Sequence, residues 1–314
     1  MAEKNEEKNE FIIKASIWMK ELRAPFFTAT IVPVFLGAII AWSSSGAFNT
    51  AYFILSLIAA LCLHAGTNMV NDYFDFKSGC DIVNKDFVSP FTGGSRLLPQ
   101  SLLKPRNVHT AALLSFSLAS LIGVFLAFQT GWIILFLGVI GILSGYFYTT
   151  QLATRVVGEF FVGLNFGPLM VLGSYYVQTQ KFALEPLAAS IPIGLLIANV
   201  LWINEIPDYT ADKYVGKNTC VVRLGRKRAA DVYTAIMIAT YVSIALGVGL
   251  KLMPVVSLIS LATIPMALKA IKIAREHYGE PSKLVPANAS TITIHLLTGI
   301  LLALGYVIHH IFMV

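Results

Sequence analysis

Long apolar runs, separated by short polar segments, cover most of this 314-residue chain. A helix that crosses a membrane needs about 20 consecutive, mostly apolar residues. The runs that approach this length are residues 26–42, 51–76, 108–128, 132–150, 156–178, 187–207, 232–250, 253–273 and 288–312. The pattern therefore predicts an all-α, multi-pass membrane bundle of nine transmembrane helices.

The chain begins with a different pattern. Met1 to Glu10 is highly charged, which is typical of a disordered cytosolic head and not of a cleavable signal peptide. Residues 11–22 then combine apolar positions with Lys14, Lys20 and Glu21, as expected for an amphipathic helix on the membrane surface. We expect residues 11–314 to form a single transmembrane domain.

Composition agrees with a membrane protein. Hydrophobic residues make up 56% of the chain and charged residues 13%, whereas soluble domains contain about 25% charged residues. The net charge is +6, but the basic residues form no single patch, so no nucleic-acid partner is expected. The three cysteines have neither paired nor metal-site spacing.

The basic residues predict the orientation. With nine helices and a cytoplasmic N-terminus, they concentrate before the first helix and after the second, fourth, sixth and eighth. Of the 23 basic residues, only Lys181 and Lys251 then lie outside. Because basic loops tend to remain in the cytoplasm, we expect a cell-membrane protein with its N-terminus inside.

A polar stretch at residues 68–81 closes the second apolar run. Asn68, Asp72 and Asp75 are spaced i, i+4, i+7, so they lie on one face of a helix. Such acceptor-rich side chains at a membrane boundary are costly unless a cation lies among them. Their oxygen atoms suit Mg²⁺, which keeps several waters and binds largely through substrate phosphates.

A similar stretch at residues 204–212 closes the sixth run. Asn204, Asp208 and Asp212 are spaced i, i+4, i+8. In the predicted topology both stretches lie on the cytoplasmic side, so we expect them to face each other and share one ligand. In both regions Asn-x-x-x-Asp at a helix end precedes a basic loop, which indicates a weak internal duplication.

The neighbouring loops suit an anion bridged by metal, and a diphosphate fits this description. The loop after the second helix contains Gly-Gly-Ser-Arg at residues 93–96, whose glycines allow backbone amides to approach an anion. The loop after the sixth helix contributes Lys217 and Arg223 as counter-charges. The helix interiors offer an apolar chamber for a hydrophobic tail.

Two motifs resemble the signatures of the UbiA superfamily of membrane-embedded prenyltransferases. These are Asn-Asp-Tyr-Phe-Asp at residues 71–75 and Asp-Tyr-Thr-Ala-Asp at residues 208–212, the latter followed by Gly-Lys-Asn-Thr. Residues 91–96 and 173–179 are similar to the branch that prenylates 1,4-dihydroxy-2-naphthoate for menaquinone. Many members carry a third Asp where this chain has Gly79, and here Asp81 follows two residues later.

The resemblance implies Mg²⁺-dependent transfer of a polyprenyl group from polyprenyl diphosphate to an aromatic acceptor in quinone biosynthesis. The residues implied to hold Mg²⁺ are Asn68, Asp72, Asp75, Asp208 and Asp212, and the four aspartates are also the implied catalytic residues. Those implied to contact the substrates are Asn68, Asn204, Lys77, Arg96, Lys217, Arg223, Tyr146, Tyr148, Arg23 and Arg155. Among them, the tyrosines can steady an allylic cation, and Arg23 and Arg155 can position an acceptor carboxylate. The active site is expected near the cytoplasmic face of the lipid bilayer.

Several alternatives stay open on the sequence alone. Within the enzyme class they are prenylation of 4-hydroxybenzoate and of a geranylgeranylglyceryl phosphate in ether-lipid synthesis. A cation-coupled transporter also uses intramembrane acids, but it is expected to have inverted repeats and acids near mid-membrane. Glu159 is expected to pair with Arg155, four residues earlier. The sequence specifies no oligomeric state.

Overall fold

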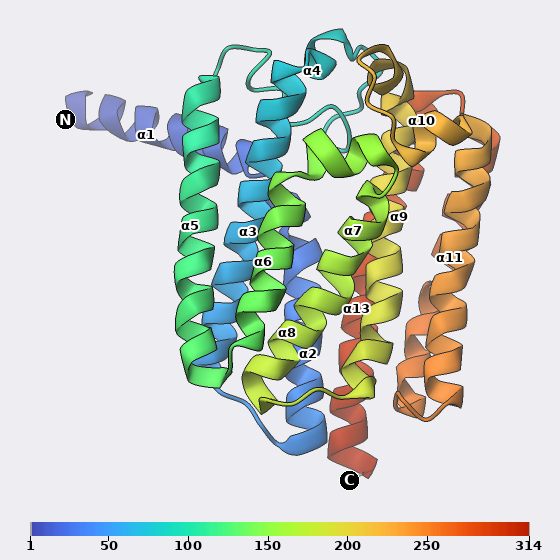
Figure 1. Cartoon of the computed structure of the whole chain (residues 1–314). Coiled ribbons are helices and arrows are strands. Elements are labelled where there is room, and N and C mark those ends of the chain that lie inside the picture. Colours follow the sequence, from blue (N-terminus) through green and yellow to red (C-terminus); the bar gives the residue numbers. More distant parts are fainter. Residues whose placement is uncertain (1, 314) are drawn as a thin grey trace.

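A computed structural model describes residues 2–313 of the chain, with side chains at Glu10 and from Ile12 to Phe312. Within this part of the chain all regular secondary structure is helical. The helices stand side by side in one upright bundle (Figure 1). The predicted all-α membrane architecture is confirmed.

Eight stretches of the described chain are long and apolar enough to span a membrane: Ala24–Ser45, Thr50–Lys77 (α3), Pro105–Thr130 (α5), Gly158–Thr179, Leu184–Tyr214 (α9), Arg226–Gly249 (α11), Val255–His277 and Pro281–Phe312. A ninth is a broken pair, Ile133–Tyr146 (α6) and Tyr148–Arg155, bent by 65° at the break. Counted as one span, this pair completes the nine predicted helices.

Some of these spans contain more than one element. The parts are η1 (Ala24–Phe27) with α2 (Thr28–Ser45), η2 (Tyr148–Leu152) with η3 (Ala153–Arg155), α7 (Gly158–Leu164) with η4 (Asn165–Leu169) and α8 (Met170–Thr179), and η5 (Val255–Thr263) with α12 (Ile264–His277). The last span lies in α13 (Pro281–Met313). The short helices α4 (Cys80–Val83) and α10 (Cys220–Leu224) follow α3 and α9.

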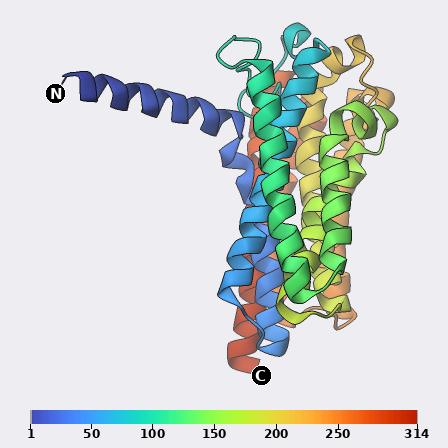
Figure 2. The same cartoon turned by 60° about the vertical axis from the view of Figure 1, so that its left-hand side comes forward.

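The first helix, α1 (Ala2–Glu21), leaves the bundle sideways (Figure 2). This direction is the one expected for a helix on the membrane surface. Its backbone is helical already from Ala2, where the sequence predicts a disordered head up to Glu10. An ion pair one turn apart, Glu10 with Lys14 at 2.5 Å, favours the continuous helix. The predicted domain boundary at Glu10 stays a prediction.

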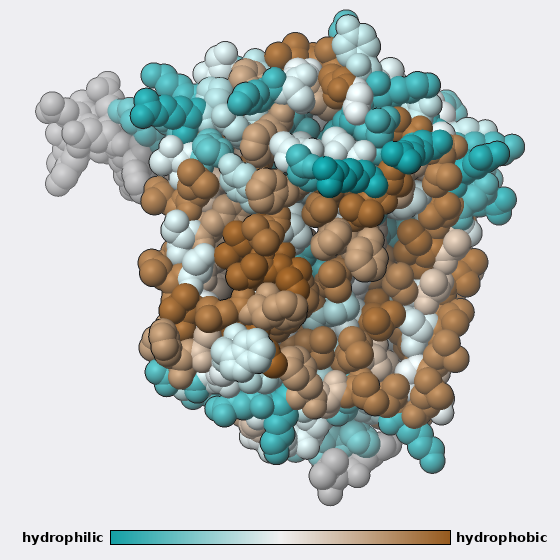
Figure 3. All heavy atoms as spheres, viewed as in Figure 1, coloured by the Kyte–Doolittle hydropathy of each residue, from teal (hydrophilic) through white to brown (hydrophobic). Residues whose placement is uncertain are grey.

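Polar side chains gather at both ends of the bundle, and apolar side chains form the belt between them (Figure 3). This is the distribution that a bilayer imposes, because its hydrocarbon core cannot hydrogen-bond to polar groups. The ends of α3 and α9 lie at the end of the bundle from which α1 departs, and the C-terminus lies at the other end (Figure 1). Both polar stretches found in the sequence therefore occupy one end.

Helix α9 continues past Pro207, where the sixth helix was predicted to end, and reaches Tyr214. A proline inside a helix leaves the carbonyl group four residues earlier without its donor. Here that group is the carbonyl of Ile203, and the side-chain amide of Asn288 on α13 donates to it at 3.2 Å. The hydrogen bond from α13 replaces the one lost at Pro207, so α9 continues without a break. The second motif therefore lies inside α9 and not beyond its end.

An apolar chamber lies in the N-terminal half of the bundle, lined mainly by α3, α6 and the span from α7 to α8. Gly138, Gly141 and Gly145 all line it and lie along one face of α6. A methyl group added to Gly138 would meet nothing within 4 Å. Because glycine has no side chain, these positions help to keep the chamber open. The upper end of the chamber reaches Tyr148.

Candidate active site

Asp72, in the last turns of α3, is held by two neighbouring segments. The Arg23 guanidinium forms an ion pair with its Oδ1, and the backbone N–H of Ser95 donates to its Oδ2 at 2.8 Å. A Cβ atom on Gly94 would lie 2.8 Å from the Asp72 carboxylate, and the φ of Gly94 is +70°. Only glycine fits this approach comfortably. The predicted anion-approaching loop thus contacts a carboxylate of the chain itself.

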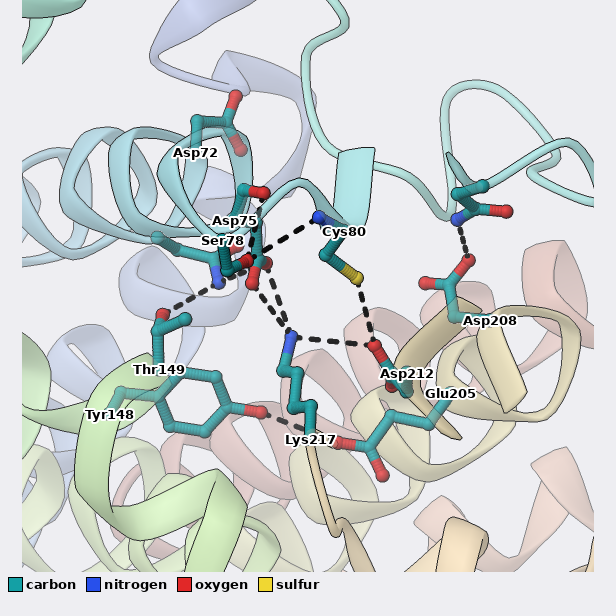
Figure 4. Close-up of polar contacts among 12 residues, drawn as sticks. Asp72, Asp75, Ser78, Cys80, Tyr148, Thr149, Glu205, Asp208, Asp212 and Lys217 are labelled. Carbon is teal, nitrogen blue, oxygen red and sulfur yellow. Dashed lines mark hydrogen bonds and ion pairs between the residues drawn. The ribbon is translucent and has the colours of Figure 1, made fainter. Parts of the chain in front are cut away.

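Lys217 joins the two acidic stretches (Figure 4). Its Nζ lies 3.1 Å from the Asp75 carboxylate and 3.7 Å from Asp212 Oδ1. Burial disfavours the ammonium ion, but the carboxylates of Asp212 and Asp75 raise the pKa of Lys217 well above its ordinary value, so the group carries its charge. The structure therefore brings the two stretches together, as the sequence predicts.

Further hydrogen bonds fix the carboxylates of both stretches (Figure 4). The Asn71 amide donates to Asp75 Oδ2 and to the Thr149 hydroxyl, both at 2.9 Å. The Cys80 thiol donates to Asp212 Oδ1 at 3.3 Å. In the same way, the Asn84 amide donates to Asp208 Oδ1 at 2.7 Å. The segment between α3 and α5 thus ties the first motif to the second.

Asp81 belongs to the same group of acids. Arg96 donates to its backbone carbonyl and stacks on the Phe87 ring at 4.3 Å from the ring centroid. Burial, then the nearby charges of Asp75 and Asp72, raise the pKa of Asp81 to about 8. The four aspartates of the two motifs already outnumber Lys217, Arg23 and Arg96, the three cations that contact this group.

The donor set suits a hard divalent cation. Carboxylate oxygens predominate among the side chains of both motifs. Within the described residues no three His, Cys, Asp or Glu side chains already converge as a metal cage. This arrangement fits Mg²⁺, which keeps waters and substrate phosphates among its ligands and needs no complete protein cage.

Below the acids lie two carboxyl groups, those of Glu159 and Glu205, that the sequence analysis did not assign to the site, together with Tyr148, which it did. The Tyr148 hydroxyl donates to Glu205 Oε1 at 3.4 Å. The backbone N–H of Cys220 donates to Glu159 Oε1 at 2.9 Å. The expected pair of Glu159 with Arg155 is not formed, because Arg155 is exposed and Glu159 turns inward to cap α10. The sequence signal of Glu159 was a carboxylate inside an apolar run, whereas Glu205 lies beside Asn204 in the second polar stretch.

The other predicted site residues lie outside this group. Those exposed to solvent are Lys77, Arg155 and Arg223. Tyr146 hydrogen-bonds to His109 at 3.3 Å, in the packing between α5 and α6. The Asn68 amide donates to the Leu22 carbonyl at 3.0 Å, and Asn204 accepts from Asn288 at 2.7 Å. These residues need a rearrangement, or the bound substrate, to act as predicted.

Comparisons with known proteins agree with this geometry. The 2-carboxy-1,4-naphthoquinone phytyltransferase of Synechocystis sp. is 27% identical over 295 residues, 92% of each chain. The 1,4-dihydroxy-2-naphthoate octaprenyltransferase of Bacillus subtilis is 29% identical over 291 residues, 90% of this chain and 89% of the relative. The solved structure of a UbiA homolog from Archaeoglobus fulgidus bound to DMAPP and Mg²⁺ has a TM-score of 0.63 at 16% identity, covering 90% of this chain and 98% of that one.

The family assignment rests on the sequence, and the fold agrees with it. The model of the UbiA prenyltransferase family matches residues 30–292, which is most of the chain and includes both acidic motifs. The resemblance predicted from those motifs is therefore confirmed. The chain belongs to the UbiA prenyltransferase family.

Proposed function

We propose that this enzyme transfers a polyprenyl group from polyprenyl diphosphate to an aromatic acceptor, 1,4-dihydroxy-2-naphthoate, in quinone biosynthesis, and that the reaction depends on Mg²⁺. The observation that carries the proposal is the meeting of two acidic motifs at one end of an apolar chamber. The relatives whose printed names give a naphthoate or naphthoquinone prenyltransferase support the acceptor.

In this proposal the diphosphate binds among the acids and the prenyl tail enters the chamber. Asp72, Asp75, Asp208 and Asp212, with Asn68, would hold Mg²⁺. When bound, the metal supplies positive charge against the diphosphate oxygens as the allylic C–O bond breaks. A fixed arrangement of charge of this kind lowers the barrier because it needs no reorganisation during the reaction.

The chain's own groups complete the site. Lys217 already lies between the motifs, so its ammonium can turn from the carboxylates to the diphosphate oxygens. Arg23 and Arg96 add charge from the loop side. The Tyr148 ring at the upper end of the chamber can face the allylic cation, and the apolar lining excludes water from it.

We also propose that the active site opens near the cytoplasmic face. Basic residues concentrate in the segments at the end of the bundle that carries the acids, and such segments face the cytoplasm. A cation-coupled transporter is disfavoured because the acids lie at helix ends and because the chain belongs to a prenyltransferase family.

The direct test supplies purified enzyme in lipid nanodiscs with Mg²⁺ and a radiolabelled prenyl diphosphate. Three acceptors are compared: 1,4-dihydroxy-2-naphthoate, 4-hydroxybenzoate and geranylgeranylglyceryl phosphate. We expect a labelled lipid product with the naphthoate, identified by mass spectrometry, and its loss after chelation of divalent cations. Turnover with another acceptor alone would refute the proposed acceptor, and full turnover without divalent cations would refute the proposed metal dependence.

The matched variants are Asp75→Asn and Asp212→Asn, one from each motif. Each removes one charge without changing the size of the side chain. We expect both to lose at least a hundredfold in kcat, in line with the loss of one preorganised electrostatic group. Asp231→Asn is the control, because Asp231 is exposed and pairs with Arg275 at 3.6 Å away from the site; it is expected to keep full activity.

A further inference from the structure

The apolar chamber continues well below the acidic site. Tyr148 lies at its upper end, and Gly138 and Ile134 of α6 line its lower part. Gly138 precedes the end of α6 at Tyr146 by eight residues, which correspond to about 12 Å along a helix. An extended isoprene unit is about as long as one helical turn, roughly 5 Å. A prenyl tail that begins beside Tyr148 therefore reaches Gly138 with its third isoprene unit and Ile134, one turn lower, with its fourth.

The contact between α3 and α6 loosens towards this level. The two helices stand side by side and rise in the same direction (Figure 1). A Cβ atom on Gly145 would clash with the hydroxyl group of Thr67, and one on Gly141 would lie 3.7 Å from a methyl carbon of Leu63. Within the described residues, a Cβ atom on Gly138 would meet nothing within 4 Å. The space between α3 and α6 is thus wider in the lower part of the chamber than at its upper end.

Small residues of three helices surround the lower part of the chamber. The register of the two contacts between α3 and α6 places Ala60 of α3 opposite Gly138, and both residues line the chamber. Gly123 of α5 precedes Gly131, in the turn to α6, by eight residues, and Gly138 follows it by seven, so these two glycines lie at one level. In the described part of the chain, a Cβ atom on Gly123 would also meet nothing within 4 Å. These positions therefore surround a cavity and do not form a stripe on a single helix.

A space of this kind requires an apolar occupant. Protein interiors are otherwise close-packed, and side chains that line a void lose dispersion contacts. Apolar cavities exclude water but bind apolar molecules. The lower part belongs to the same chamber as Tyr148, which lies beside the acidic site. The tail of a substrate held by the acids is therefore the molecule that reaches this space directly.

We propose that the level of Ala60, Gly123 and Gly138 is a length-selecting subsite, which binds the third and fourth isoprene units of the prenyl donor. A donor with four units fills this level, whereas a donor with two units ends above it and leaves it empty. The substrate class is a prenyl diphosphate of at least four isoprene units. This inference rests on the proposed function, since it assumes a prenyl diphosphate whose tail enters the chamber.

The test is a competition between two donors in one assay. Purified enzyme in lipid nanodiscs receives equal amounts of geranyl diphosphate, with two units, and geranylgeranyl diphosphate, with four, together with Mg²⁺ and 1,4-dihydroxy-2-naphthoate. Mass spectrometry gives the ratio of the two products, which equals the ratio of the kcat/KM values and does not depend on how much of the enzyme is active. We expect the wild type to favour the four-unit product at least tenfold.

Gly138→Leu places a side chain where the third isoprene unit lies. Leucine is the better helix former, and the described residues leave room for its first carbon, so we expect the variant to fold. A misfit of one methylene group in an apolar pocket discriminates by about 10–200-fold. We therefore expect kcat/KM for the four-unit donor to fall at least tenfold, while that for the two-unit donor stays within threefold of the wild type.

Gly123→Leu enters the same level from α5 and should change the product ratio in the same direction. It keeps the inference testable if Gly138→Leu does not fold. The matched control is Gly249→Leu, which adds the same side chain at the end of α11, outside the chamber, where nothing described lies within 4 Å. This control should keep the product ratio of the wild type.

A wild-type ratio below threefold would overturn the inference, and so would an unchanged ratio in both Gly138→Leu and Gly123→Leu, which would indicate that a lipid chain occupies the lower part of the chamber. The affinities of unreactive thiolodiphosphates of both lengths, measured without an acceptor, separate this inference from the proposed function. A preference for the four-unit analogue that Gly138→Leu abolishes would support the subsite even if no naphthoate were prenylated. Equal affinities of the wild type for both analogues would overturn the subsite and leave the proposed reaction intact.

Discussion

Lys217→Met is the substitution that most directly perturbs the contact between the two motifs. It removes the ammonium that lies 3.1 Å from Asp75 and 3.7 Å from Asp212, while an apolar chain of similar length remains. The Lys217 side chain is only 14% exposed, so water cannot replace the lost charge. Both carboxylates would then repel each other without a counter-ion.

The expected loss of stability is large. Removing one partner of a buried ion pair costs about 3–5 kcal/mol. Each kcal/mol moves the melting temperature of a chain of 150–250 residues by roughly 2–4 °C. Without divalent cations we therefore expect Lys217→Met to melt about 6–20 °C below the wild type, with a kcat reduced by about 10²–10³ because the diphosphate loses a cationic partner.

The proposed metal makes the prediction specific. Mg²⁺ binding supplies the charge that the substitution removed, so the melting temperature of the variant should recover as Mg²⁺ is added. The wild type should respond less, because its own lysine already neutralises the carboxylates and competes with the metal. The assay is thermal unfolding in nanodiscs over a series of Mg²⁺ concentrations.

Lys213→Met provides the control from the same segment. Lys213 is exposed and donates to the Tyr209 hydroxyl at 3.4 Å, one turn away on the same helix, so its removal should change stability by less than about 0.5 kcal/mol. A melting temperature of Lys217→Met equal to that of the wild type without Mg²⁺, or equal stabilisation of both proteins by Mg²⁺, would show that Lys217 does not neutralise the two carboxylates.

Three further substitutions test other parts of the account. Gly94→Ala forces a Cβ to within 2.8 Å of the Asp72 carboxylate, so we expect at least tenfold lower activity and a lower melting temperature. Asn288→Ala removes the donor to the Ile203 carbonyl, which should cost about 1–3 kcal/mol in thermal unfolding. Burial, then the charge of Asp72, raise the pKa of Glu21 from 4.5 to about 7. The folded state thus holds this proton more tightly than the unfolded state, so wild-type stability should fall as pH rises from 4.5 through 7, and Glu21→Gln should remove that part of the pH dependence.

Each of these substitutions has a matched control. Gly249→Ala, at the end of α11 and outside the chamber, adds a methyl group where nothing lies within 4 Å, so it should leave activity unchanged and stability equal or higher. Asn107→Ala changes an exposed asparagine in α5, and Glu10→Gln an exposed glutamate in α1. A control that loses as much as its partner variant, or a Glu21→Gln curve parallel to that of the wild type, would contradict the corresponding explanation.

The number and order of the membrane spans could be predicted because each one is a long run of local composition. The end of the sixth helix could not. Pro207 is a local signal for termination, and Asn288, which supplies the missing hydrogen bond, lies on the last helix. Such a partner is known only once the helices are packed.

The only local signal for the broken fourth span was the Ser144-Gly145 pair just before the break, since Gly/Ser pairs favour kinks. The predicted run at residues 132–150 is continuous, with no proline inside it. In the structure α6 stops at Tyr146 and the chain bends by 65°. After the bend, Thr149 accepts the hydrogen bond from Asn71 on α3 at 2.9 Å. The bend thus brings η2 to the acidic cluster, through a contact that only the assembled bundle provides.

The acidic residues of the site could be predicted because their spacing repeats within single helices. Glu159 and Glu205 escaped that reasoning, because their carboxyl groups meet across two helices: Glu159 looks isolated in its apolar run, and Glu205 does not follow the four-residue spacing of Asn204, Asp208 and Asp212. Lys77 and Arg223 show the converse. They are near the motifs in sequence, yet the last turn of α3 places Lys77, and the short helix α10 places Arg223, on the exposed surface.

In the proposed mechanism both acidic motifs bind one metal-bound diphosphate. The most direct measurement is an experimental structure with an unreactive prenyl thiolodiphosphate and Mn²⁺ in place of Mg²⁺, with the metal located by its anomalous scattering. We expect a diphosphate whose metal contacts include carboxylates of both motifs, with Asp75 and Asp212 on opposite sides. A diphosphate bound to one motif alone, or metal density away from both, would contradict it.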